Sequence, residues 1–134
     1  MLTLLLSTAL AAGPLPAAVP AIESTLTAFT EGVAARDVAQ VRATLHADAR
    51  QFVRIGGKLE VIETPAYLSL LEAGTIGGTP TVRTLHGIDV SDGQALVRQT
   101  RTAGELTFHD AVTLVQNGDQ WSIVAMAVTL EGVP

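Results

Sequence analysis

Phe29-Thr-Glu-Gly-Val-Ala-Ala-Arg-Asp37 and Leu45-His-Ala-Asp-Ala49 stand near the start of the chain. Near its end, Phe108-His-Asp-Ala-Val-Thr-Leu-Val115 continues through Asn117-Gly118 into Trp121-Ser-Ile-Val-Ala-Met126. In the first two stretches, apolar residues recur at helical spacing. In the last two, apolar and polar residues alternate on either side of Asn117-Gly118, a dipeptide typical of hairpin turns. These stretches decide the fold, because they predict a helical first part and a closing pair of antiparallel strands.

Three helices are predicted in the first part of the chain. The first runs over about 20–36, where apolar residues recur on one helical stripe: Ile22, Leu26, Phe29 and Val33. Asp37 followed by Gln40 resembles a capping box and begins a second, short helix. A third helix starts at Thr64-Pro65 and ends at Gly74, a residue suited to a left-handed cap.

Strands are predicted over about 49–55 and 59–62, on either side of Gly56-Gly57. Further strands follow in succession, over about 82–90, 95–101, 105–116 and 120–130. In the first of these, alternate residues are expected to share one face: Val82, Thr84, His86, Ile88 and Val90. Helices followed by a run of antiparallel strands indicate an α+β fold.

The quoted motifs resemble those of the nuclear transport factor two-like superfamily. The resemblance is closer to its small bacterial branch described as putative lumazine-binding, whose members show aromatic-x-x-G-x-x-x-x-D, then H-x-D-A, then a closing F-x-D hairpin with W-x-I-V. It covers roughly 21–130 and implies a cone-shaped fold, with three N-terminal helices packed on a curved, mainly antiparallel sheet around a cavity. It implies no reaction, because the same fold serves isomerases, cyclases, dehydratases and binding modules.

The first 22 residues carry no charged side chain, and an apolar run from Leu2 to Leu10 is followed by small residues. This pattern is typical of a secretory signal peptide, and the run is too short to span a bilayer. We therefore expect a signal peptide and flexible leader over 1–19, a nuclear transport factor two-like domain over 20–134, and a periplasmic or secreted protein without membrane contact once the signal is removed. The alternative is a leading helix that packs on the domain.

Composition excludes several classes of function. The net charge of −5 argues against a nucleic-acid partner, which would require a basic surface. The chain has no Cys, which excludes disulfides and thiolate chemistry. His46, His86 and His109 are not spaced as local metal ligands, and phosphate-binding and hydrolase motifs are absent from the sequence. We expect neither a metal nor a cofactor.

The resemblance also allows a comparison with the ketosteroid isomerases of the same superfamily. Their matching helix carries a Tyr where this chain has Phe29, and Phe has no hydroxyl to polarise a substrate carbonyl. Their general-base Asp follows the second motif, where this chain reads Arg50-Gln-Phe-Val-Arg54. The isomerase mechanism therefore does not carry over.

Asp110 is the leading candidate for a functional group, because it interrupts an otherwise apolar strand face formed with Phe108, Val112 and Leu114. It either lines the cavity or pairs with Arg98 or Arg101 on the neighbouring strand. His46 has two interpretations as well: a polar group at the cavity rim, or a residue that satisfies the backbone where a helix gives way to a strand.

The sequence supports three functions. The first is an exported binding protein that holds a small apolar or aromatic molecule, with these candidate ligand-binding residues: Phe29, His46, Phe52, Arg54, Tyr67, Phe108 and Asp110. The second is an enzyme of the polyketide-cyclase or dehydratase type in which Asp110 or His46 moves a proton. The third is a protein-interaction subunit. A homodimer is expected through the outer face of the sheet, which we assign to Val97, Ala111 and Thr113.

Overall fold

The computed structural model describes residues 17–132, so most of the predicted signal peptide lies outside the described residues. The elements follow one another in the order α1 (Ala18–Ala35), α2 (Val38–Thr44), β2 (Leu45–Ile55), β3 (Lys58–Glu63), α3 (Thr64–Glu72), β4 (Thr81–Ser91), β5 (Gln94–Ala103), β6 (Leu106–Asn117) and β7 (Gln120–Glu131). Helices therefore occupy the first part of the chain and long strands the second. The predicted α+β class is confirmed.

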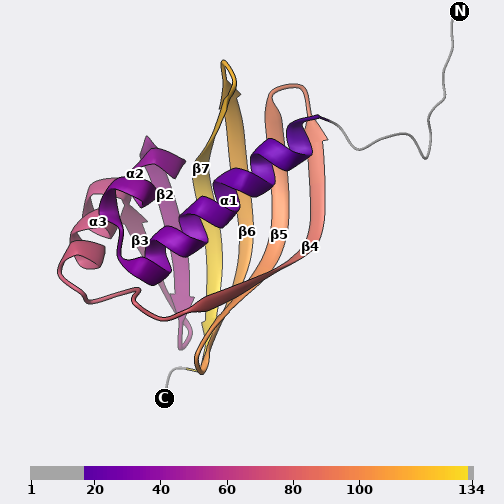
Figure 1. Ribbon diagram of the computed structural model, residues 1–134. Helices are drawn as coiled ribbons and strands as arrows, with labels where there is room; N and C mark the ends of the chain where they lie inside the picture. Colours follow the sequence, from indigo (N-terminus) through magenta and orange to yellow (C-terminus); the bar gives the residue numbers. More distant parts are fainter. Residues whose placement is uncertain (1–16, 133–134) are drawn as a thin grey trace, which may run out of the picture.

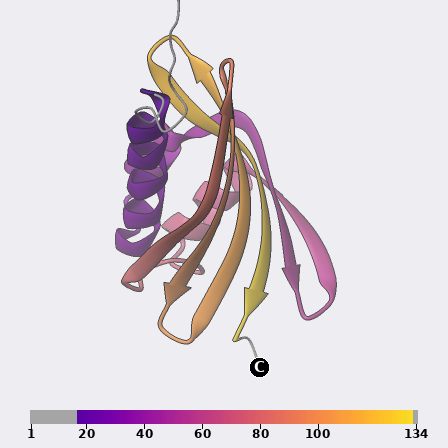
Figure 2. The same ribbon diagram turned by 90° about the vertical axis from the view of Figure 1, so that its right-hand side faces the viewer.

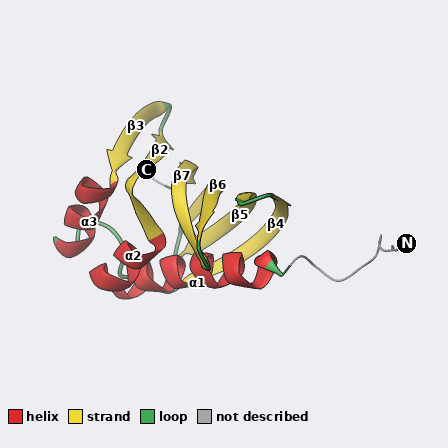
Figure 3. Cartoon of the chain, turned by 90° about the horizontal axis from the view of Figure 1, so that it is seen from above, coloured by secondary structure: helices red, strands yellow, loops and turns green. Residues whose placement is uncertain are grey.

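The strands form one sheet in the order β3-β2-β7-β6-β5-β4. All neighbouring pairs are antiparallel except β2 and β7, which run parallel and join the early hairpin to the late meander. The helices lie together on one side of this sheet, with α1 crossing it diagonally (Figure 1). Seen from above, the sheet curves over the helical layer, as expected for the cone (Figure 3).

The helices form where apolar spacing and capping residues require them. Ile22, Leu26 and Phe29 on α1 are fully or almost fully buried in the core. Figure 2 shows α1 lying against one face of the sheet. The Asp37 carboxylate accepts a hydrogen bond from the Gln40 backbone N–H at 3.1 Å, as the sequence predicted for the start of α2. Among the described helices, none combines the length and the apolar character that crossing a bilayer would need.

The sequence prediction for β4 was wrong about its faces. The pairing of β4 with β5 shifts between Leu85 and Gly87, so that His86 is an extra residue in the strand. This bulge leaves Val82 on the outer face, 70% exposed, and turns Ile88 towards the core. Strict alternation fails because one inserted residue exchanges the two faces of everything beyond it.

Val97 was also placed on the wrong face. Its side chain is fully buried in the core, opposite Val112 on β6, whereas its neighbour Leu96 is 52% exposed on the outer face. Both faces of β5 carry apolar side chains, so hydrophobicity alone does not decide which face is buried. The outer face of the sheet is therefore described by Leu96 and Ala111 rather than by Val97.

Candidate ligand-binding cavity

A cavity of about 370 Å³ lies between the helices and the inner face of the sheet. Its walls come from α1, α3, the segment after α3, β2, β3 and β5 to β7, and most of its lining side chains are apolar: Val33, Val53, Ile55, Ile62, Leu70, Ile76, Leu106, Phe108, Val128 and Leu130. A smaller chamber of about 70 Å³ shares Val33, Gly77, Leu106, Phe108 and Arg101 with it. The polar side chains on the lining are few, which is the usual character of a small-molecule site.

Aromatic rings and one guanidinium form a wall of this cavity. The Phe29 and Tyr67 rings stack with their centroids 6.0 Å apart and their planes at 21°. The Arg101 guanidinium carbon lies 4.4 Å from the Phe108 ring centroid and 5.7 Å from that of Phe29. These contacts hold the cation against π faces, where the ring quadrupoles favour it. The stacked pair thus joins the Tyr67 ring on α3 to the Phe29 ring on α1.

Asp110 forms a buried ion pair with Arg101. Arg101 donates from Nε to Oδ2 at 2.5 Å and from Nη2 to Oδ1 at 3.0 Å, a bidentate geometry. The Asp110 side chain is fully buried and that of Arg101 is 5% exposed. Of the two arginines that the sequence offered as partners, Arg101 faces inward with Asp110, whereas Arg98 is exposed on the other face. Asp110 therefore sits behind Arg101, and Arg101 is the group that lines the cavity.

A chain of polar contacts supports this ion pair on the side away from the cavity. Gln99 donates to Asp110 Oδ2 at 2.9 Å and accepts from Arg83 Nη1 at 3.1 Å. Arg83 in turn pairs with Glu23 on α1 and donates to Thr27. The chain links the cavity wall to the β4 edge of the sheet, with the neutral Gln99 amide between the two ion pairs. Because every member has a partner, Asp110 and Arg101 are held in a single arrangement.

Gln51 and Tyr67 are the other polar side chains deep in the cavity. Burial raises the pKa of the Tyr67 phenol, an effect opposed by the nearby Arg101 charge and by the Gln51 amide and reinforced by the Asp110 charge. Tyr67 is therefore a neutral hydroxyl at physiological pH. Gln51 is 5% exposed, and its Nε2 makes no hydrogen bond to any of the residues that the structure describes. Such an unpaired buried donor is rare and costly in a native protein.

Two of the predicted ligand-binding residues, Tyr67 and Phe108, line the cavity. Two others contact lining residues from behind, since Phe29 stacks on Tyr67 and Asp110 binds Arg101. The structure does not bring the other three to this cavity. Phe52 and Arg54 point to the outer face, because Gln51 and Val53 alternate with them and face inward. His46 is exposed at the start of β2, where its Nδ1 accepts a hydrogen bond from the Asp48 N–H at 3.0 Å.

Sequence reasoning missed Gln51 as a site residue and treated Arg101 only as a possible partner of Asp110. Arg101 lies six residues after Ala95, and every second side chain of a strand points to the same face. The alternation along β5 could therefore have placed Arg101 on the inner face with Ala95. For Gln51 the signal was ambiguous, because the run Arg50-Gln-Phe-Val-Arg54 offers polar and apolar residues to both faces. Within residues 17–132, no three His, Asp or Glu side chains gather as a metal site would require.

A known protein family matches most of the chain. Residues 17–127 match the model of the family described as "Putative lumazine-binding". The chain belongs to this family. No protein among those with curated descriptions matches the sequence. The fold of this chain is the one found in solved nuclear transport factor two-like proteins.

Solved structures with the same fold come from several bacteria. A nuclear transport factor two-like protein of unknown function from Silicibacter pomeroyi is 14% identical, with a TM-score of 0.76 over 84% of this chain and 95% of its own. One from Shewanella baltica is 18% identical, with a TM-score of 0.75 over 85% and 94%. A cystatin-like fold protein from Burkholderia xenovorans is 20% identical, with a TM-score of 0.65 over 90% and 96%. At such identities the likeness shows the fold alone.

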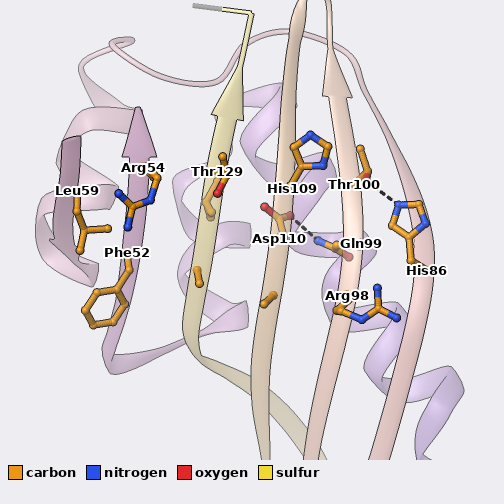
Figure 4. Close-up of a pocket in the computed structure, with 13 residues that line it drawn as sticks. Phe52, Arg54, Leu59, His86, Arg98, Gln99, Thr100, His109, Asp110 and Thr129 are labelled. Carbon is orange, nitrogen blue, oxygen red and sulfur yellow. Dashed lines mark hydrogen bonds between the residues drawn. The ribbon is translucent and has the colours of Figure 1, made fainter. Parts of the chain in front are cut away.

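This family member also has an open groove of about 870 Å³ on the face of the sheet opposite the helices. Figure 4 shows Phe52, Arg54 and Leu59 on one side of it and His86 and Arg98 on the other. His86 Nε2 lies 2.6 Å from Thr100 Oγ1, and His109 Nε2 lies 3.0 Å from a Glu131 carboxylate oxygen. The lining of the groove thus mixes charged and polar side chains with apolar ones, and the sheet itself separates the groove from the cavity.

Proposed function

We propose that this protein binds a small apolar or aromatic molecule inside its cone. The observation that carries the proposal is the cavity of about 370 Å³, whose apolar walls surround a buried amide donor without a partner in the described chain. A cavity of this size suits a compact ring system. The family description, which names lumazine, supports the same class of ligand.

Catalysis is the alternative, in the form of proton transfer by Asp110 or His46 in an enzyme of the polyketide-cyclase or dehydratase type. Such a reaction needs an acid and a base that face one cavity. His46 is exposed and outside the lining of the cone, while both Asp110 oxygens accept hydrogen bonds from Arg101. These positions favour binding over catalysis.

We also propose that the protein pairs as a homodimer through the outer face of its sheet, and that it acts after export. Exposed apolar side chains support the pairing, since Phe52, Leu59, Val61 and Leu96 lie on that face.

The uncharged start of the sequence supports export. N-terminal sequencing of the natively expressed protein tests export: a chain that begins between Ala12 and Pro20 is expected, and an intact Met1 would contradict it.

Filling the cavity tests the binding function. Val53 is half-buried on the cavity wall, so Val53→Trp should occupy the space that a ligand needs. Val82→Trp is the matched control, because Val82 is 70% exposed on the outer face and lines neither the cavity nor its side chamber. We expect native mass spectrometry to find a small molecule with the wild type and the control, and little with Val53→Trp. Titration with lumazine should follow the same order.

The binding proposal fails if neither a co-purified molecule nor lumazine binds the folded wild type. It also fails if Val53→Trp, still folded by circular dichroism, binds as tightly as the control.

A further inference from the structure

Among the polar side chains that line the cavity, Gln51, Tyr67 and Arg101 offer hydrogen-bond donors, and the remaining one, Thr75, is exposed. Gln51 Nε2 is buried and has no acceptor among the described residues. The hydrogen bonds of the Arg101 guanidinium to described residues leave from Nε and Nη2, so Nη1 makes none of them. The Tyr67 hydroxyl is a further donor, because a phenol is protonated at neutral pH and burial raises its pKa still further. A ligand that satisfies this cavity must therefore bring acceptors.

The charge of the site is already balanced. Arg101 and Asp110 form a bidentate pair with both side chains buried, so their charges compensate one another. An anionic ligand would place a second negative charge beside a pair whose only positive charge is already compensated. Burying such an uncompensated charge is strongly unfavourable. A pure hydrocarbon would carry no such cost but would leave the Gln51 donor unpaired.

We propose that the cone binds a neutral ring compound through a carbonyl oxygen, with Gln51 Nε2 and Arg101 Nη1 as the donors that recognise it. This inference rests on the proposed binding function and specifies its ligand class. The apolar walls hold the ring, while Phe108 and Tyr67 present aromatic surface to it. The ligand oxygen then supplies the acceptor that Gln51 Nε2 lacks among the described residues.

Three probes of one skeleton test the ligand class: indane, indanone and indane carboxylate. They differ in bearing no acceptor, a neutral carbonyl or an anion. Isothermal titration of the wild-type protein should find indanone bound about tenfold more tightly than indane, the gain expected for a hydrogen bond to a charged or buried donor. The carboxylate should bind more weakly than indanone.

Gln51→Met is the test at the residue, because Met keeps the length of the side chain and removes its amide. Indanone affinity should fall towards that of indane, while indane affinity stays the same. The melting temperature of the unliganded variant should rise or stay unchanged, since a buried unpaired donor is lost. Gln116→Met is the matched control: Gln116 is exposed near the end of β6 and should affect neither measurement.

The outcomes separate this inference from the function on which it rests. If indane and indanone bind equally well, or the carboxylate binds best, the carbonyl inference is overturned while binding in the cone stands. A fall in melting temperature of Gln51→Met with unchanged indanone affinity would make Gln51 a structural residue and also overturn it. If none of the probes binds, and the folded wild type neither carries a co-purified molecule nor binds lumazine, the proposed function falls together with the inference.

Discussion

At the scale of single residues, Tyr67 reports directly on the cavity because it is the one tyrosine in the sequence. Its phenolate absorbance therefore belongs to a single group. Burial raises its pKa above the ordinary value of 10.0, so the folded state retains the proton to higher pH than the unfolded state. A group of this kind contributes constant stability below pH 10.0 and loses it as the pH rises from there through the folded pKa.

We expect an ultraviolet titration of the folded protein to give a midpoint above 10.0 and the denatured chain to return to it. Above that pH, the free energy of unfolding should fall more steeply for the wild type than for Tyr67→Phe, which has no phenol to titrate. Equal midpoints in the folded and denatured chains would show that Tyr67 is in contact with water.

The ion pair of Asp110 with Arg101 makes a second prediction at this scale. Asp110→Asn leaves the buried Arg101 cation without its charge partner, which should destabilise the protein by about 3 kcal/mol. Arg98→Gln changes an exposed arginine of the same strand and should cost no more than about 0.5 kcal/mol. Urea unfolding measures the free energy of unfolding of both variants. Similar small effects for the two variants would mean that the buried pair adds no stability.

At the scale of elements, Arg36 joins the end of α1 to the segment that follows α3. Arg36 has a left-handed backbone conformation with φ of 54°. Its guanidinium donates to the carbonyl oxygens of Gly74, Ile76 and Gly77 at 3.0 Å each. Gly78 passes so close that an added Cβ would lie 2.5 Å from the guanidinium carbon. Because Ile76 and Gly77 line the cavity, Arg36 shapes its wall from outside.

Arg36→Ala should therefore loosen this segment more than it destabilises the fold. We expect faster amide hydrogen exchange over 74–78 and a loss of about 1 kcal/mol in the free energy of unfolding, since the lost hydrogen bonds are exposed to solvent. Arg42→Ala, at an exposed position of α2, is the control and should leave the exchange of 74–78 unchanged. Unaltered exchange in Arg36→Ala would show that the glycine turns hold the segment by themselves.

At the scale of the whole molecule, pairing through the outer sheet face is testable at Ala111. This residue is exposed on β6 and lines the outer groove between Arg98 on β5 and Ala127 on β7. Ala111→Asp should place a charge within the interface and shift a dimer to monomers, whereas Ala39→Asp on the exposed side of α2 should not. Light scattering at micromolar concentration measures both. A monomeric wild type would contradict the dimer.

The sequence by itself predicted the helices, the strands and their order, because apolar period, capping residues and turn dipeptides act over a few neighbouring residues. Asp37 at the start of α2 and the glycine after α3 are such local signals, and both predictions were confirmed. The family motifs added the cone and its cavity, because they combine segments far apart in the chain.

Tertiary structure decided which residues meet. The bulge at His86 depends on pairing with β5, and the burial of Val97 depends on the strand opposite it, so neither follows from the local pattern. The same holds for the site. Asp110 forms its ion pair with a residue of β5, and the Tyr67 ring stacks on a ring of α1. Phe52 and Arg54 lie on the outer face, because Gln51 and Val53 occupy the inner face of β2. Strand register is fixed by the free energy of the whole packed sheet, and a shift of one residue exchanges its two faces.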